Sequence, residues 1–384
     1  MVPKKDLTLF EAASIITGFG IGGGVMAVPY LASLNGVFPF IILLAVAFFL
    51  SVIFHLIAAE IMMRDSKSNQ LIEIFHKYLF RARGGAVFTW IFFILILMAF
   101  ITNLSACIAG GGEILRDLLG IPVETGHIIT YLLSASVVFF GLKVVGLSEK
   151  FAVIGIILLV GVLVIGSRGL PFKLTWIKPV EYKEPLALFG MIMFSFTSLF
   201  SIPQAVEGLQ WNPKLIPKSI ILGLFINLCI VTAVTLSAMG VSGTVTRIAI
   251  SGWSQALGNW AFILGSLFVL LAILTSYWSI SFALAVIVKE RLKWGDRSSW
   301  LLATIPSLAI AVTNVTDFMG FMRITGGAIA LLIAILIIPL YHNTKKYGDV
   351  KNPQWKLKIL GNWFFQTLVL SGFILMALGS LIEL

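Results

Sequence analysis

The chain has 384 residues, of which 59% are hydrophobic and only 11% are charged, and its mean hydropathy is +1.03. Soluble domains carry about 25% charged residues, so this composition excludes an ordinary water-soluble domain and indicates a membrane protein. The net charge of +10 comes mainly from basic residues at the ends of apolar segments. That placement favours membrane lipid over nucleic acid as the partner, and it leaves the oligomeric state open.

Apolar stretches long enough to cross about 30 Å of hydrocarbon recur along the whole chain. They predict about 11 transmembrane helices, near 8–33, 36–63, 86–115, 125–142, 149–167, 185–209, 216–240, 258–289, 299–315, 319–341 and 361–382. Of the 27 Lys and Arg residues, about 20 fall on the N-terminal side of the membrane and about 7 on the other. We therefore expect a multi-pass protein of the cell membrane with a cytoplasmic N-terminus and, after an odd number of spans, an outside C-terminus. An amphipathic helix is expected at the inner surface, within 67–83.

The first span has an unusual interior, TGFGIGGGVMAVPY. Five glycines lie close together in it, and each costs a helix about 1 kcal/mol relative to alanine. They are Gly18, Gly20, Gly22, Gly23 and Gly24. Unpaired backbone groups are tolerated at membrane depth only where they line a protein-enclosed or watery cavity. The segment therefore predicts a broken helix that lines a binding cavity.

The sixth span contains a second interruption, SFTSLFSIP at 195–203. Its hydroxyl side chains compete for backbone partners, and Pro203 removes a backbone donor. Interrupted segments at corresponding positions of two five-span halves indicate an inverted-repeat transporter. The prediction is an all-α, leucine-transporter-like 5+5 repeat with broken helices 1 and 6, forming a single domain over 1–384. The first repeat is expected at 8–167, the second at 185–341 and an extra C-terminal helix at 361–382.

Three patches of the sequence carry a family resemblance: GFGIGGGVMAVPYLASLNG, SFTSLFSIP and LTSYWSISFAL. They resemble the amino acid/auxin permease group, and within it the bacterial hydroxy- and aromatic-amino-acid permeases, of the amino acid–polyamine–organocation superfamily. The resemblance covers most of the chain in topology but only these patches in motif. It implies a secondary active transporter that symports an amino acid, which we expect to be neutral, with Na⁺ or H⁺ by alternating access.

An amino acid is a zwitterion, so its charges need fixed dipoles in place of the water they lose in a low-dielectric interior. The N–H groups of the glycines at 22–24, at the start of a half-helix, are suited to the carboxylate. Carbonyl groups freed on the other half, near Thr17, Phe19 and Gly20, are suited to the ammonium group or to a metal cation. Close packing of helices is the alternative role of these glycines.

The sixth span is expected to supply the opposite wall of the site. Hydroxyl and carbonyl groups of Phe196, Thr197 and Ser198 would hold the ammonium group, and Phe196 and Phe200 would bound the side-chain pocket. Asn103 in the third span is a further candidate for substrate contact. Hydrogen bonding within or between helices is the alternative role for each of these polar groups.

The resemblance also implies a site for one Na⁺ ion and no other cofactor. Hydroxyl groups of Thr275 and Ser276 in the eighth span would complete it together with carbonyl groups of Thr17 and Gly20. Ordinary hydrogen bonding between helices is the alternative reading of this pair. Bacterial permeases of this kind are often proton-coupled, so both Na⁺ and H⁺ remain candidate coupling ions.

Other classes of membrane protein fit the sequence less well. A membrane enzyme would need a nucleophile–base set or a metal cluster, but the four histidines are scattered over different depths, so we expect no enzyme. A channel would need a symmetric filter or a ring of charge, which two asymmetric breaks do not suggest. A channel or an amino acid sensor without coupled transport remains the alternative to a carrier.

Overall fold

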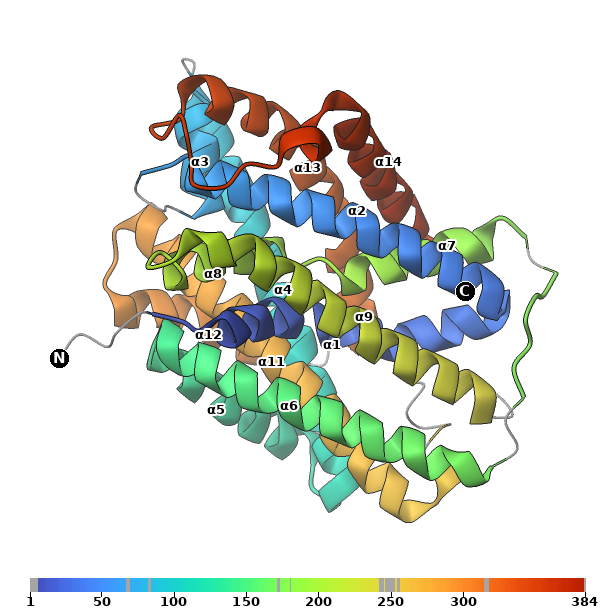
Figure 1. The fold of residues 1–384 in the computed structure, drawn as a ribbon. Helices are drawn as coiled ribbons and strands as arrows, with labels where there is room; N and C mark the ends of the chain where they lie inside the picture. The colour runs from blue at the N-terminus through green and yellow to red at the C-terminus, as the bar shows by residue number, and fades with distance from the viewer. Residues whose placement is uncertain are drawn as a thin grey trace.

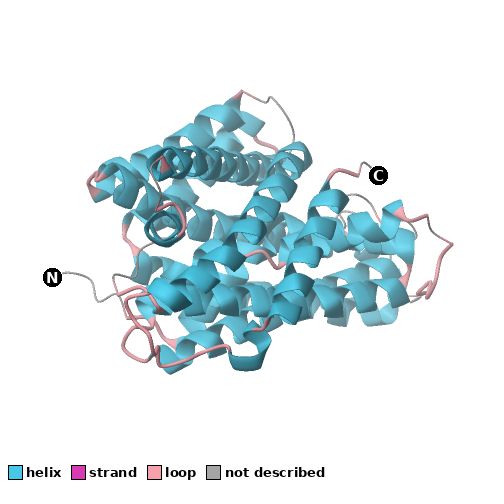
Figure 2. Cartoon of the chain, turned by 90° about the horizontal axis from the view of Figure 1, so that it is seen from above, coloured by secondary structure: helices cyan, strands magenta, loops and turns pink. Residues whose placement is uncertain are grey.

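The computed structural model describes residues 6–382, except for 67–69, 82–83, 171–172, 180, 242–244, 246–252, 254–255 and 314–317. The regular structure of this described part is entirely helical (Figure 2). The α-helices are α1 (Leu9–Asn35), α2 (Val37–Met63), α3 (Leu71–Tyr78), α4 (Gly85–Leu119), α5 (Val123–Phe139), α6 (Leu142–Gly166), α7 (Lys183–Ser195), α8 (Ile202–Gly208), α9 (Ile216–Val241), α11 (Asn259–Leu292), α12 (Asp296–Val312), α13 (Phe318–Tyr347) and α14 (Trp363–Ser380). Short 3₁₀ helices lie at Ser167–Gly169 (η1), Leu199–Ser201 (η2), Pro213–Leu215 (η3) and Lys358–Gly361 (η4).

The predicted spans correspond in order to these helices. The first is α1, the sixth is the interrupted pair α7 and α8, and the eleventh is α14. Within the described residues, seven helical segments are long and apolar enough to cross a membrane, and the bent α1 makes an eighth. The N-terminus lies at one end of the bundle and the C-terminus toward the other (Figure 1).

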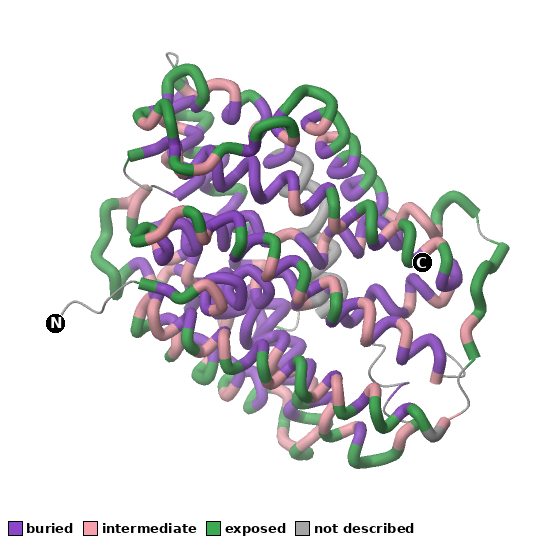
Figure 3. Tube along the Cα trace, viewed as in Figure 1, coloured by how far each residue is buried: buried purple, intermediate pink, exposed green. Residues whose placement is uncertain are grey.

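Helix α1 forms the centre of the bundle. It packs against α6, α7, α9 and α11, and apolar side chains around its circumference are buried (Figure 3). A helix that is apolar on every side is stable only inside a larger apolar assembly. The packing also recurs between the two halves, because α9 packs on α1 as α2 packs on α7, and α6 packs on α11 as α13 packs on α4. In a 5+5 repeat, a contact between two helices is expected to recur between the corresponding helices of the other half.

The amphipathic helix expected within 67–83 is present as α3, but its surroundings differ from the prediction. Leu71, Ile74 and Phe75 are buried. Helix α3 packs against α4, α11 and α13. The apolar face therefore contacts the protein instead of lying on the lipid surface. The sequence pattern located the apolar face correctly, because the same periodicity serves either environment.

A buried carboxylate connects α2 to the last part of the chain. Glu60 Oε1 accepts from Arg64 Nε at 3.0 Å and from Nη2 at 2.7 Å. Its Oε2 accepts from the Tyr341 hydroxyl at 3.0 Å and from the Leu357 N–H at 2.8 Å. With its side chain 1% exposed, this carboxylate depends on all four bonds, because buried charges are stable only when paired and hydrogen-bonded.

We expect Glu60→Ala to destabilise the protein by about 3–5 kcal/mol, because it leaves the Arg64 charge buried and unpaired. Thermal unfolding of the purified protein in detergent should show a midpoint several degrees lower. The matched control is Asp117→Asn, in an exposed pair with Arg116, which should change stability by about 0–1 kcal/mol. Equal shifts for the two variants would contradict the assignment of a buried anchor at Glu60.

Candidate substrate and cation site

The first break lies at Gly22, where the backbone leaves helical geometry with φ −24° and ψ −122°. The segments Leu9–Gly22 and Gly24–Asn35 meet at an angle of 53°. Helix α11 satisfies the backbone groups at this bend, because Ser276 Oγ accepts from the Gly22 N–H at 3.1 Å and donates to the Gly18 carbonyl at 2.8 Å. The Ser276 hydroxyl thus supplies a hydrogen-bond partner to one backbone N–H and one backbone carbonyl at the break.

The second break lies between the end of α7 at Ser195 and the start of η2. Its freed carbonyl at Ser195 accepts from Asn227 Nδ2 of α9 at 2.5 Å. The N–H of Ser198 donates to His55 Nε2 of α2 at 2.9 Å, while His55 Nδ1 lies 2.6 Å from the Ser51 carbonyl. These partners assign His55 as the neutral tautomer with its proton on Nδ1. The histidine therefore acts as a backbone cap for the interrupted span.

The two breaks lie against each other. Ser198 Oγ donates to the Ile16 carbonyl of α1 at 2.9 Å. A Cβ atom at Gly20 would lie 2.7 Å from the Ser195 carbonyl oxygen and 2.8 Å from Ser198 Oγ, and one at Gly24 would lie 2.7 Å from Ser195 Cα. Any side chain at either glycine would separate α1 from the second break. The close approach therefore requires glycine at both positions.

Aromatic rings surround this junction. The Phe100 ring of α4 packs edge-on against Phe19 at 6.3 Å and against Phe200 at 4.7 Å between centroids. Phe196 instead packs against Phe48 of α2, at 5.9 Å. The cluster of Phe19, Phe100 and Phe200 thus joins both broken spans to α4.

Two further predicted substrate contacts take different positions. Asn103 is half-buried on α4, one helical turn beyond Phe100 and thus on the same face of the helix. The Thr197 hydroxyl, inside the second break, donates to the Met193 carbonyl of α7 at 3.0 Å. Gly23 lies outside the residues whose surroundings the structure describes. Phe100 was absent from the sequence prediction, although its spacing of three residues from Asn103 was a usable signal.

The residues expected to hold Na⁺ are distributed around the first break. Thr17 Oγ1 donates to the Gly223 carbonyl of α9 at 2.9 Å and lies 3.0 Å from the Ala13 carbonyl. Thr275 Oγ1 donates to the Ala272 carbonyl of its own helix at 3.0 Å. Ser276 occupies the bend as described above. Within the described residues, no group of three or more His, Cys, Asp or Glu side chains is placed to hold a metal ion.

A buried acid beside the first break was missed by the sequence prediction. Glu149 lies on α6, and its Oε1 is 2.5 Å from Ser279 Oγ of α11. A Cβ atom at Gly18 would lie 2.8 Å from the Glu149 Cδ atom. The sequence prediction began the fifth span at 149, whereas α6 begins seven residues earlier, at Leu142. Because Glu149 is followed directly by Lys150, the sequence is typical of a charged loop, and it gave no sign that the glutamate is buried.

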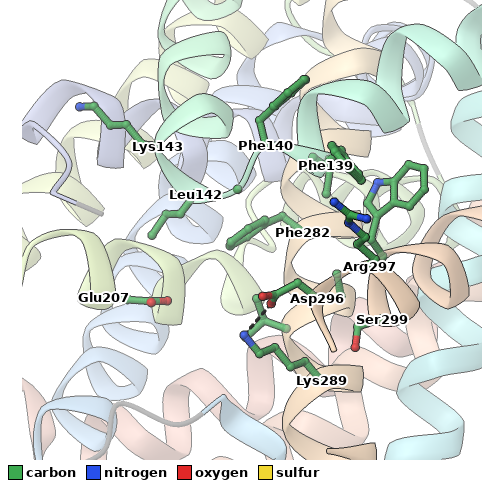
Figure 4. Close-up of a pocket in the computed structure, with 15 residues that line it drawn as sticks. Phe139, Phe140, Leu142, Lys143, Glu207, Phe282, Lys289, Asp296, Arg297 and Ser299 are labelled. Carbon is green, nitrogen blue, oxygen red and sulfur yellow. Dashed lines mark hydrogen bonds and ion pairs between the residues drawn. The ribbon is translucent and has the colours of Figure 1, made fainter. Parts of the chain in front are cut away.

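A cavity of about 450 Å³ opens near the end of the bundle that holds the start of α6 (Figure 4). The turn between α5 and α6 forms one side, and α8, α11 and α12 form the others. Lys143, Glu207 and Arg297 are among its lining residues, and Lys289 pairs with Asp296 at 2.5 Å. Most of the lining is apolar, and the predicted site residues of the two breaks are not among the residues that line it. We call this cavity the vestibule.

A profile of the tryptophan/tyrosine permease family matches residues 5–380, nearly the whole chain. The chain belongs to this family. The membership supports the amino acid permease part of the resemblance drawn from the sequence.

Two relatives of this permease cover most of its length. A tyrosine-specific transport system of Haemophilus influenzae is 24% identical over 356 residues, which is 86% of this chain and 87% of the relative. An uncharacterised protein of Methanocaldococcus jannaschii is 23% identical over 384 residues, covering 91% and 85% respectively.

Among solved structures, the permease is similar to Mhp1, a nucleobase-cation-symport-1 family transporter, in a closed conformation with bromovinylhydantoin bound. The TM-score is 0.67 at 14% identity, and the match covers 98% of this chain and 92% of Mhp1. This likeness confirms the predicted leucine-transporter-like, all-α membrane fold. The permease is a multi-pass membrane transporter.

We expect Gly20→Ala to abolish substrate uptake while the protein still inserts and folds, because its Cβ would push the second break away from α1. Uptake by cells that express equal amounts of protein, judged by size-exclusion profile and surface yield, is the measurement. Gly161→Ala on α6 is the matched control, since a Cβ there meets no atom within 4 Å. Normal uptake by Gly20→Ala would contradict the requirement for glycine where α1 contacts the second break.

Proposed function

We propose that this permease is a secondary active transporter that symports a neutral, aromatic amino acid with Na⁺ or H⁺ by alternating access. The observation that carries the proposal is the contact of two broken helices at Gly20, Ser195 and Ser198, with phenylalanine rings beside it. The permease family and the relative named for tyrosine transport support the same class of substrate.

The substrate carboxylate would bind at the start of the second half of α1. The first N–H groups of a helix have no partner within it, and the helix dipole adds positive potential there. The Gly22 N–H is engaged by Ser276, so the following amides are the proposed donors.

The ammonium group would bind to carbonyl groups of the second break, near Phe196 and Thr197. The Ser195 carbonyl already accepts a bond from Asn227, which leaves the next carbonyls of the interrupted turn as the proposed acceptors. The substrate ring would then contact Phe19, Phe100 and Phe200. Aromatic rings pack against one another edge-on or offset, and such pairs contribute about 0.5–1.5 kcal/mol beyond their buried area.

We further propose that the permease lies in the cell membrane with its N-terminus in the cytoplasm. The excess of Lys and Arg in the segments on the N-terminal side supports this orientation. The vestibule near Lys143 and Glu207 would then face the cytoplasm.

The direct test is uptake of radiolabelled tryptophan, tyrosine, phenylalanine, leucine and alanine into proteoliposomes under an imposed pH or Na⁺ gradient. We expect aromatic substrates to accumulate against their own gradient. Substrate binding without accumulation would indicate a sensor, and flux that only dissipates the substrate gradient would indicate a channel. Either result would overturn the proposal.

Phe100→Ala tests the substrate class. We expect it to raise the KM for aromatic substrates about three- to tenfold, which corresponds to the loss of roughly 0.7–1.4 kcal/mol of ring contact. The matched control is Phe151→Ala on α6, whose side chain is 63% exposed and faces away from the junction. An unaltered preference for aromatic amino acids in Phe100→Ala would show that the ring cluster is not part of the substrate site.

A further inference from the structure

Glu149 is a buried acid with an incomplete set of hydrogen bonds. The residue is 0% exposed, and while Oε1 bonds to Ser279 Oγ at 2.5 Å, Oε2 has no partner in the described structure. Ser279 Oγ also lies 3.3 Å from the Ile15 carbonyl of α1. Gln204 of α8 donates to the Ser279 carbonyl at 2.9 Å, and its own Oε1 is likewise buried without a described partner. The acid therefore lies where α1, α6, α8 and α11 meet.

No described ion pair compensates a negative charge at Glu149. The elements packed against α6 are α1, α5, α8, α9, α11 and η1. The titratable side chains on these elements and on α6 are Glu11, Tyr30, Glu124, His127, Tyr131, Lys143, Lys150, Arg168, Glu207, Lys218, Cys229, Tyr277, Lys289, Glu290 and Arg291.

The nearest basic residues along α6 are directed elsewhere. Lys143 pairs with Glu11 at 2.6 Å, and the Lys150 ammonium lies over the Phe151 ring, 5.9 Å from its centroid. Among the groups on α11, the Tyr277 hydroxyl bonds to Ser307 at 3.2 Å. An ionised carboxylate without a cation is costly in such an interior, so the group holds a proton or a cation instead.

The hydrogen bonds around Ser279 suit a proton. When Glu149 is protonated, its hydroxyl donates to Ser279 Oγ, and the Ser279 hydroxyl donates to the Ile15 carbonyl. When the proton leaves, the Ser279 hydroxyl turns to the carboxylate, and the Ile15 carbonyl loses that partner. A metal ion would instead need several oxygen ligands, whereas Ser279 already supplies the only described bond to the carboxyl group.

The vestibule offers a route for this proton. Leu142 lines the cavity and lies seven residues before Glu149 on α6, so both occupy the same helix face about 10 Å apart. Phe282 and Glu207 also line it, each three residues beyond Ser279 and Gln204 respectively. Figure 4 shows Leu142, Phe282 and Glu207 around this space. The cavity therefore begins about two helical turns from Glu149 along α6.

We propose that Glu149 binds the proton that drives transport and exchanges it with water in the vestibule. A hydronium ion in the vestibule gives its proton to a carboxylate oxygen and is left as water, the charge of the site changes from −1 to 0, and the Ser279 hydroxyl turns to the Ile15 carbonyl. Because Ile15 belongs to the first half of α1, the proton is coupled to the helix that carries the substrate site. This inference rests on the proposed transport function and specifies its coupling ion.

Glu149→Gln tests the coupling, because glutamine resembles the protonated acid but cannot release a proton. We expect the variant to exchange labelled for unlabelled substrate at close to the normal rate. A gradient of about 1 pH unit can sustain about tenfold accumulation by a one-proton carrier, and the variant should lose this accumulation entirely. Glu124→Gln, at an exposed position of α5, is the matched control and should accumulate normally.

A second measurement does not depend on transport. Infrared difference spectra of the purified protein, recorded while the pH is raised, should show the loss of a protonated carboxyl band, and that band should be absent from Glu149→Gln. Glu149→Asp retains an acid and should retain a shifted band, which separates loss of the carboxyl group from misfolding.

Three outcomes would overturn the proposal. They are an unchanged carboxyl band in Glu149→Gln, unchanged pH-driven accumulation by that variant, and accumulation in the wild type that follows a Na⁺ gradient and weakens in Glu149→Gln. The first two leave the transport function standing. Absence of any uptake by the wild type would instead reject the proposed function, while the infrared titration still decides whether Glu149 binds a proton.

Discussion

The structure depends on one constraint: every backbone group released by a broken helix inside the membrane must find another partner. An unpaired buried N–H or C=O costs several kcal/mol in such an interior, so a break without partners would refold into continuous helix or destabilise the protein. Here three neighbouring helices supply the partners. Ser276 closes the first break, and Asn227 and His55 close the second. In the proposed function, the remaining backbone groups of the breaks bind the charged ends of the substrate.

The sequence predicted the breaks because their causes are local. Five closely spaced glycines disfavour a helix in any surroundings. Hydroxyl side chains before Pro203 likewise weaken the backbone hydrogen bonds of the helix. The i,i+4 spacing of Glu60 and Arg64 is likewise a local pattern that favours pairing, and the two side chains pair in a buried position. Local pattern therefore predicted the order of the spans and the positions of both breaks.

The partners of the breaks could not be predicted in the same way. His55 and Ser198 are 143 residues apart, and Ser276 and Gly18 are 258 apart, so their contacts depend on how whole helices pack. Glu149 was missed for a different reason. Beside Lys150 it reads as a charge at a helix end, and only the actual start of α6 at Leu142 places it two turns inside the span.

Hydroxyl groups make this junction suitable for movement. A serine hydroxyl is both donor and acceptor and can change partners by rotating, and a neutral hydrogen bond contributes only about 0.5–1.5 kcal/mol net. Ser198 joins α1 to the second break, and Ser276 and Ser279 join it to α11. If α1 shifts, each hydroxyl can bond to water, substrate or a carboxylate in place of a backbone carbonyl. The energy difference between two positions of α1 then stays within a few kcal/mol, which is the range that binding of a substrate or a proton can reverse.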